Sequence, residues 1–432
     1  MRVMRTADDD FTREFEKIRA RGDRIDEEVL RTVGEILRRV DEGGDAALLD
    51  LTERFDGIRL DATALEVQAA EMDRALDGID GTTRNVLELS AERIEHYHRQ
   101  QMAGSWFDRD EPGIILGQQV RPLERVGIYS PGGRAPYPST VLMAAVPARV
   151  AGVEEVVLVT PARDGAVHPL ILAAAKMAGV DRVFRIGGAQ AVAALAYGTE
   201  TVPRVDKIVG PGNIYVTMAK KMVYGRVAID MIAGPSEILI ICDGTADPDI
   251  VAADLLSQAE HDEMAGSMLL TPSEAFARAV ADEVERQLLL LPRKEIAEKA
   301  LARFGAAVVT DGIDEAIDIA NGYAPEHLEL MVSHPEEILG RIKHAGAIFL
   351  GMHTPEALGD YIAGPNHILP TGGTARFFSP LGVYDFVKRS SVISFSGTAL
   401  RKYGPGAAAF AGLEGLDAHV RSLSLRLEKE RA

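Results

Sequence analysis

Cysteine is nearly absent from this chain, since Cys242 is the only one among 432 residues. A single cysteine excludes an intrachain disulfide and any site built from clustered thiolates. A bound metal must therefore take nitrogen and oxygen ligands. Cys242 ends the apolar run Glu-Ile-Leu-Ile-Ile-Cys. Because burial raises the pKa of a thiol, we expect Cys242 to pack in a core rather than act as a nucleophile.

Long apolar runs and positive charge are also scarce. No uninterrupted apolar run reaches the roughly 18 residues that a membrane-spanning helix needs. The N-terminus, which carries three acidic residues at 8–10, has no apolar core of the kind found in secretory signals. Acidic residues number 65 against 47 basic ones, for a net charge of -18, and such a surface repels nucleic acid and anionic lipid. We expect a cytoplasmic protein that binds neither nucleic acid nor membrane.

Apolar residues are plentiful enough for a large core, because 47% of the chain is hydrophobic. A chain of this length predicts two or three globular domains. Over about the first hundred residues, apolar side chains recur every three or four positions, as in amphipathic helices. From Val126 onward, short β-branched runs alternate with alanine-rich stretches, which indicates parallel α/β structure. The predicted strands are 126–130, 155–160, 206–210, 236–243, 267–271, 306–310, 328–332 and 346–350.

These βα units suffice for two separate sheets. Glycine- and proline-rich joints at 130–138 and 233–236 predict the limits of an inner domain. The predicted division is an N-terminal helical arm at 1–24, a discontinuous first domain at 25–129 and 237–381, a second domain at 130–236, and a C-terminal tail at 382–432. Residues 360–382 lack periodicity and predict an ordered loop system, and 413–430 predicts a helix.

Two residue pairs in the α/β region could carry chemistry. Gln258 and His261 lie three residues apart on a predicted helix, so both side chains share one face and could bind a metal together. By itself, this spacing is more often that of two solvated helix residues. Glu326 and His327 follow Pro325 at the entry to a predicted strand and could supply two bases of different strength. A surface glutamate beside a capping histidine would show the same pattern.

Further candidates lie toward the C-terminus. Asp360 and His367 flank the Gly364-Pro365 turn, in a glycine-rich loop that allows close approach of a ligand. Asp360 is the better candidate metal ligand, because it is a carboxylate with no basic partner near it in the sequence. Glu414 and His419 lie in the predicted tail. Taken alone, that tail is more simply an exposed terminal helix.

Three glycine-rich stretches each follow a predicted strand and open a helix, at 130–140, 186–195 and 209–221. Backbone N–H groups at a helix N-terminus stabilise a pyrophosphate or a carboxylate. None of the three has the GxGxxG pattern of a dinucleotide-binding turn. Each one alone is equally compatible with an ordinary tight turn.

Seven ordered segments, taken together, resemble the histidinol dehydrogenase family over essentially the whole chain. These segments are ERVGIYSPGGRAPYPSTVLM, GGAQAVAALAYGT, DKIVGPGNIYVTMAKK, IDMIAGPSEILI, DLLSQAEHD, NGYAPEHLEL and LGDYIAGPNHILPTGG. Their number and consistent order are far more specific than any single motif.

The resemblance implies a fold, an activity and an assembly. The implied fold is α/β, with two incomplete Rossmann-like domains that hold parallel sheets, small helical N- and C-terminal extensions, and an intertwined homodimer with shared active sites. The implied activity is the NAD-dependent oxidation of L-histidinol through L-histidinal to L-histidine, the last step of histidine biosynthesis. The implied cofactors are NAD and one Zn²⁺ per subunit.

The resemblance also assigns residues by position. The implied catalytic pair is Glu326 and His327. The implied metal ligands are Gln258, His261, Asp360 and His419, with His419 and Glu414 donated by the partner subunit. The implied substrate contacts are Ser236, Gln258, His261, His327, Asp360, Glu414 and His419. The implied NAD contacts are Tyr129, Gln190 and Asn213.

Two other classes of protein are compatible with parts of the pattern. A metal-dependent hydrolase could use the same ligands with Glu326 as its base, but it leaves the glycine-rich turns without a purpose. A non-catalytic metal- or nucleotide-binding assembly protein does not need Glu326 beside His327. Formation of NADH from histidinol would distinguish a histidinol dehydrogenase from the hydrolase and from the non-catalytic binding protein.

Overall fold

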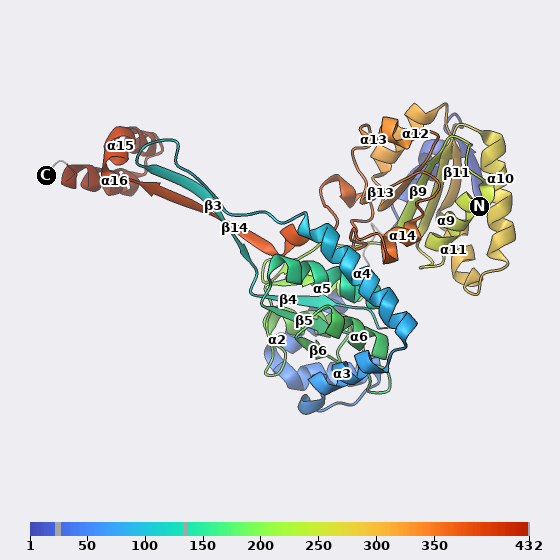
Figure 1. The fold of residues 1–432 in the computed structure, drawn as a ribbon, viewed down its shortest axis with the longest axis horizontal. Helices are drawn as coiled ribbons and strands as arrows, with labels where there is room; N and C mark the ends of the chain where they lie inside the picture. Colours follow the sequence, from blue (N-terminus) through green and yellow to red (C-terminus); the bar gives the residue numbers. More distant parts are fainter. Residues whose placement is uncertain (22–26, 133–135, 431–432) are drawn as a thin grey trace. The chain divides into compact units, whose positions relative to one another are not determined.

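The computed structural model describes residues 1–21, 27–132 and 136–430 (Figure 1). The chain divides into two compact units, one of Met1–Gln101 with Leu123–Phe386 and one of Met102–Pro122 with Val387–Ala432. The predicted boundary between 24 and 25, and part of the first glycine-rich stretch at 133–135, lie outside the described residues. No helix in the described part of the chain is both long enough and apolar enough to cross a membrane.

The first unit contains a six-stranded parallel sheet, called sheet A, with strand order β1-β11-β10-β9-β12-β13. Its strands are β1 (Arg2–Arg5), β9 (Glu237–Cys242), β10 (Gly266–Thr271), β11 (Gly305–Val309), β12 (His327–Met331) and β13 (Ala347–Leu350). The helices in its part of the chain are α1 (Phe11–Arg19), α9 (Pro248–Ala259), α10 (Glu274–Leu288), α11 (Lys294–Phe304), α12 (Ile313–Tyr323), α13 (Pro335–Leu339) and α14 (Glu356–Tyr361).

Strand β9 lies inside sheet A and is buried on both faces. Successive side chains of a strand point to opposite faces. Accordingly, Ile238 and Ile240 join a core cluster with α9, α10 and α11, whereas Leu239 and Ile241 join one with α12. Cys242 is fully buried, and burial raises the pKa of its thiol. The prediction that Cys242 is a core residue is confirmed.

Strand β1 departs from the expectation of a purely helical N-terminal region. Arg2–Arg5 pairs in parallel with β11, with Arg2 opposite Ala306. The prediction was wrong for this segment because its pairing partner lies some three hundred residues away, and four residues carry no periodicity that could reveal it.

A second parallel sheet of the first unit, sheet B, has the strand order β6-β5-β4-β7-β8. Its strands are β4 (Arg125–Tyr129), β5 (Glu155–Val159), β6 (Arg182–Phe184), β7 (Lys207–Val209) and β8 (Ala228–Ile229). The helices here are α2 (Glu27–Asp56), α3 (Ala69–Gly78), α4 (Gly81–Arg99), α5 (Pro138–Ala151), α6 (Pro169–Met177), α7 (Gly188–Tyr197) and α8 (Ile214–Val223). Helix α2 packs on α7 and α8, α3 on α6, and α4 on α5. Through these contacts, the helices of 27–99 pack with the helices of sheet B. The domain boundaries predicted from the sequence remain a proposal.

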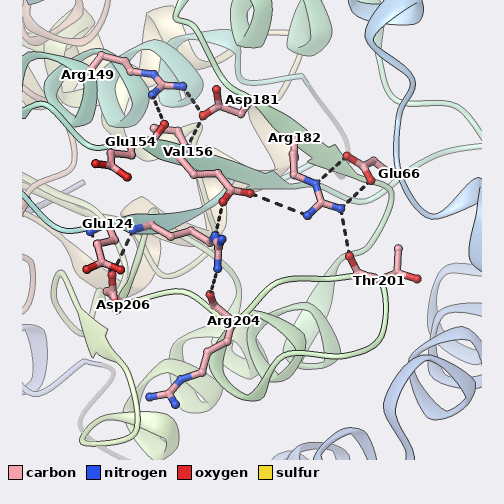
Figure 2. A network of polar contacts seen from close by, with 12 residues as sticks. Glu66, Glu124, Arg149, Glu154, Val156, Asp181, Arg182, Thr201, Arg204 and Asp206 are labelled. Atoms are coloured by element: carbon pink, nitrogen blue, oxygen red, sulfur yellow. Dashed lines mark hydrogen bonds and ion pairs between the residues drawn. The ribbon is translucent and has the colours of Figure 1, made fainter.

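Charged residues hold the amino ends of the sheet B strands together (Figure 2). The first residue of β4, Arg125, donates to the first residue of β5, Glu155, at 2.5 Å. The first residue of β6, Arg182, donates to both carboxylate oxygens of Glu66, at 2.8 and 2.7 Å. This network stabilises one end of the sheet, and the glycine-rich turns follow the strands at the other end.

The second unit is a three-stranded antiparallel sheet with two helices (Figure 1). Its elements are β2 (Trp106–Asp108), β3 (Ile114–Pro122), β14 (Val387–Phe395), α15 (Gly397–Leu413) and α16 (Asp417–Lys429). The predicted terminal helix at 413–430 corresponds to α16. Strand β14 pairs with β3 over nine residues, so most of the predicted tail is regular structure.

Candidate active site

The predicted catalytic pair lies at the amino edge of sheet A. Strands β9 and β12 are neighbours in this sheet, with His327 opposite Ile238. Glu326 directly precedes β12 and His327 is its first residue. Their chain neighbour Pro325 accepts a hydrogen bond from the backbone of Gly346 at 2.9 Å, which ties the entry of β12 to that of β13. The side chains therefore project from the edge of a paired sheet rather than from a free loop.

His327 is buried, with only 4% of its surface exposed. Its Nδ1 lies 3.1 Å from the backbone carbonyl oxygen of Glu237 and 3.1 Å from the side-chain amide of Gln258. Nε2 has no hydrogen-bond partner among the described residues and lies 3.9 Å from Oδ1 of Asp360. Burial lowers the pKa of His327 to about 4. The ring is thus neutral at pH 7.

Glu326 is buried next to His327, at 6% exposure. Its Oε2 accepts a hydrogen bond from the backbone N–H of Glu237 at 2.9 Å. Burial raises the pKa of Glu326 well above its ordinary value, and the negative charges of Glu237 and Asp360 add to the effect. This carboxyl group is a stronger base than an exposed glutamate.

A group of possible metal ligands lies beside this pair. One ligand atom each from His261, Glu356 and Asp360 lies within 4.8 Å of the others. Gln258 is fully buried, and its side-chain amide lies 2.9 and 3.1 Å from the two carboxylate oxygens of Glu356 and 3.1 Å from Nδ1 of His327. One imidazole and two carboxylates form a nitrogen and oxygen donor set that fits zinc or another first-row divalent ion.

The structure therefore brings together three of the four predicted metal ligands, Gln258, His261 and Asp360, and adds Glu356. Sequence reasoning missed Glu356. Its spacing from Asp360 could have revealed it, because Glu356 and Asp360 are four residues apart on α14 and so share a helix face. Burial raises the pKa of Glu356, and the nearby charge of Asp360 raises it further, a shift that a bound cation would oppose.

Two neighbouring residues complete this group in the first unit. Ser236 directly precedes β9, is half-buried, and its carbonyl oxygen accepts from the backbone of Gly266 at 3.0 Å. His367 donates from Nδ1 to the carbonyl oxygen of Asp360 at 3.0 Å, and burial lowers its pKa. His367 thus holds the loop after α14 against the predicted ligand.

The other two predicted substrate contacts, Glu414 and His419, belong to the second unit. Glu414 is the C-cap of α15, and His419 lies near the start of α16. Both side chains are exposed. Within their own unit they are free to meet another molecule.

The three predicted NAD contacts follow strands of sheet B. Tyr129 ends β4, is buried, and its hydroxyl accepts from the backbone N–H of Gly188 at 3.1 Å. Burial raises the pKa of Tyr129 to about 12, so it stays protonated. Gln190 is 1% exposed in the first turn of α7, and its amide lies 3.5 Å from Oδ2 of Asp56. Asn213 is the N-cap of α8 and accepts from the backbone of Tyr215 and Val216 at 3.0 and 3.1 Å.

Their placement fits a dinucleotide site. From β4 the chain proceeds to β5 and β6 on one side of the sheet, and then to β7 and β8 on the other side. Tyr129 and Asn213 follow the adjacent strands β4 and β7, where the direction of the strand order reverses. In open α/β sheets, dinucleotides bind at the carboxyl ends of strands at such a point.

A buried ion pair supports the third glycine-rich turn. Nζ of Lys220 lies 2.5 Å from Oδ1 of Asp230, and both side chains are nearly inaccessible to solvent. Asp230 accepts from the N–H of Gly210 at 2.8 Å, and Lys220 donates to the carbonyl oxygen of the same glycine at 2.8 Å. Sequence reasoning missed this pair, because nothing local indicates that Lys220 points back under the turn.

Comparison with known proteins gives consistent matches. The family model described as histidinol dehydrogenase matches residues 19–427. A histidinol dehydrogenase from Syntrophotalea carbinolica is 58% identical over 99% of both chains. One from Aquifex aeolicus is 54% identical over 98% of both.

A solved structure agrees with the sequence matches. The crystal structure of a histidinol dehydrogenase from Elizabethkingia anophelis matches with a TM-score of 0.94 at 37% identity, covering 100% of this chain and 99% of the other. Sequence and fold agree over nearly the full length, and the chain belongs to the histidinol dehydrogenase family.

Proposed function

We propose that this protein oxidises L-histidinol to L-histidine by two successive hydride transfers to NAD, with L-histidinal as the intermediate. The observation that carries this proposal is the neutral, buried His327 beside the strongly basic Glu326 and the His261, Glu356 and Asp360 group. Membership of the family supports it. The reaction is the last step of histidine biosynthesis, and we place it in the cytoplasm.

His327 is the proposed base for the alcohol. We place the ring proton on Nδ1, which lies 3.1 Å from the carbonyl oxygen of Glu237. Nε2, which has no hydrogen-bond partner among the described residues, then accepts the hydroxyl proton as hydride departs from carbon. A ring with a pKa of about 4 is ready to accept a proton at pH 7 but is a weak base. Asp360, 3.9 Å from Nε2, stabilises the ring once it is protonated.

Glu326 is the proposed base for the aldehyde step. Oxidation of an aldehyde to a carboxylate requires the addition of water, and the buried Cys242 offers no thiol for a covalent alternative. The raised pKa of Glu326 suits removal of a proton from that water. Its fixed hydrogen bond to Glu237 orients the carboxylate.

We propose one zinc ion per subunit, bound by Gln258, His261, Asp360 and a fourth ligand, His419, from a second copy of the chain. When bound, zinc supplies positive charge that orients the imidazole and amine of the substrate. Glu356 is a further carboxylate within reach of the ion. The proposed assembly is a homodimer in which Glu414 also comes from the second copy, and Ser236 completes the substrate contacts.

We propose that NAD binds at the carboxyl edge of sheet B and contacts Tyr129, Gln190 and Asn213. When bound, NAD accepts the hydride in each oxidation. The three glycine-rich turns offer backbone N–H groups at the starts of helices, and these stabilise the pyrophosphate.

The stoichiometry of NADH formation tests the proposal. We expect about two NADH per L-histidinol consumed, because both oxidations use the same cofactor. Glu326→Gln should slow oxidation of supplied L-histidinal more than that of L-histidinol. One NADH per substrate would indicate a simple alcohol dehydrogenase, and equal loss in both half-reactions would contradict the role of Glu326. Hydrolysis of the supplied substrate with no formation of NADH would indicate that the protein is a metal-dependent hydrolase.

A further inference from the structure

Arg21 and Glu237 form a buried ion pair behind the proposed catalytic residues. Their side chains are each 1% exposed, and Arg21 donates to Oε2 of Glu237 and to the hydroxyl of Tyr323. Arg21 lies just beyond α1, whereas Glu237 is the first residue of β9. The backbone of Glu237 contacts both proposed bases, but neither of the two paired side chains has a part in the proposed reaction so far.

Glu237 and Glu326 hold each other by two reciprocal hydrogen bonds. The backbone N–H of Glu237 donates to Oε2 of Glu326 at 2.9 Å, and the backbone N–H of Glu326 donates to Oε1 of Glu237 at 3.2 Å. These residues stand side by side where the paired strands β9 and β12 begin. Each carboxylate therefore satisfies the backbone N–H of the neighbouring strand end.

The same residue also orients His327. The backbone carbonyl oxygen of Glu237 lies 3.1 Å from Nδ1 of His327 and fixes this side of the ring against the start of β9. Oε1 of Glu237 accepts further from the backbone N–H of Gly372 at 3.0 Å, which attaches the loop after α14. Glu237 thus contacts both proposed catalytic groups and the segment that follows Asp360.

A buried carboxylate keeps its charge and its place only when it is paired and hydrogen-bonded. Arg21 is the cation that contacts Glu237, and the fold makes room for its guanidinium group. A Cβ atom at Gly266, at the start of β10, would come within 2.7 Å of Cζ of Arg21. The N-terminal segment is in this way connected to the amino edge of sheet A.

We propose that Glu237, held by Arg21, is a positioning residue that sets the orientation of the Glu326 and His327 side chains. This inference rests on the proposed function, because it assigns the pair a role in the same reaction. Loss of the ion pair should misplace both bases without removing any group that contacts substrate or NAD. Small misplacements of reacting groups slow the chemical step more than they weaken binding.

Arg21→Met and Glu237→Gln test the proposal. We expect each variant to lower kcat about 10- to 100-fold per folded molecule, as removal of an orienting partner does. KM for L-histidinol and for NAD should change by less than about threefold. Arg21→Lys keeps the charge and should recover part of the lost kcat.

Tyr323→Phe is the matched control. It removes one further partner of the Arg21 guanidinium but leaves the ion pair with Glu237 in place, so it should lower the unfolding temperature and leave kcat nearly unchanged. If Arg21→Met lowers kcat no more than Tyr323→Phe does, the role is only structural and the proposal is overturned. If Arg21→Met does not fold, Glu237→Gln decides the question by the same comparison.

Crystal structures of Glu237→Gln and Arg21→Met separate this proposal from the proposed function. Absence of histidinol-dependent NADH formation by the wild-type protein would overturn the function, whatever the variants do. Displacement of the Glu326 and His327 side chains from their contacts with residue 237 supports the positioning role. Unchanged contacts in both variants overturn it.

Discussion

At the scale of single residues, burial sets the protonation state of the site. Removal from water disfavours the charged form of any group. It therefore lowers the pKa of His327 to about 4 and raises the pKa of Glu326 and Glu356. Glu329, whose Oε1 accepts from the backbone N–H of Glu356, also has a pKa raised by burial, and burial raises the pKa of Asp254 to about 6. The site thus combines a neutral imidazole with carboxyl groups that hold protons unusually well.

His98 gives a prediction on the pH dependence of stability, at a distance from the proposed ligands. It is fully buried in α4, its Nδ1 lies 2.8 Å from the carbonyl oxygen of Ile94, and burial lowers its pKa. Below about pH 6.5 the unfolded chain binds a proton that the folded chain resists, so stability falls as pH falls. As pH falls, we expect the free energy of unfolding of the wild type to decrease by up to about 1.4 kcal/mol per pH unit relative to that of His98→Leu.

Denaturant unfolding of both proteins between pH 7.5 and 5 measures this difference. Above pH 7 the gap between the two free energies of unfolding should be constant, because His98 is then neutral in both states. Parallel curves over the whole range would show that protonation of His98 does not affect folding.

At the scale of elements, strand ends and helix starts make the proposed NAD site. Gly210, between β7 and α8, has φ +107°, and a Cβ there would come within 2.2 Å of the carbonyl oxygen of Tyr129. A side chain at this position is therefore strained by its backbone and blocked by a neighbouring strand. The turn can approach β4 only because residue 210 is glycine.

Gly210→Ala should disturb this turn together with Asn213, which caps the following helix. We expect a loss of about 1–3 kcal/mol of stability and a rise in KM for NAD of roughly tenfold or more. Gly225→Ala is the matched control, because Gly225 has a similar φ of +98° but no atom within 4 Å of the added Cβ. Gly225→Ala should lower the free energy of unfolding by only about 1 kcal/mol and leave KM for NAD unchanged. Equal kinetic effects of the two variants would argue against a role of the turn in NAD binding.

At the scale of the whole molecule, the second unit exposes large apolar side chains that a single copy leaves uncovered. Exposed fractions reach 55% for Trp106, 71% for Ile393, 66% for Phe410 and 86% for Leu413. Apolar surface of this kind is typical of protein interfaces. It supports the proposal that a second copy covers this unit and that Glu414 and His419 act in the site of another chain.

Mixing two inactive variants tests the shared site. His261→Asn removes a proposed ligand from the first unit, and His419→Asn removes one from the second. If the ligands come from different copies, a mixed dimer contains one intact site, and after subunit exchange about a quarter of wild-type activity should return. Mass spectrometry verifies the exchange. No recovery in verified mixed dimers would contradict the shared site.

Much of the architecture was predictable because its signals are local. The eight strands expected from β-branched runs all occur, since a buried parallel strand is apolar along its whole length. Strands β1, β2, β3, β8 and β14 escaped notice. Strands β1, β2 and β8 are only two to four residues long, whereas β14 is largely exposed and pairs with β3, which lies far away in the chain. Among site residues, the Glu326 and His327 pair was visible as a dipeptide in a strand entry.

The amino-acid sequence by itself determined the fold class, the family resemblance and the candidate residues, because apolar periodicity and ordered motifs are properties of the chain alone. Only the tertiary structure decided which groups meet. Arg21 reaches Glu237, Glu356 joins His261 and Asp360, and Lys220 supports Gly210. These contacts join segments far apart in the chain, and the pKa shifts at the site arise from burial, which exists only once the sheets and helices have packed.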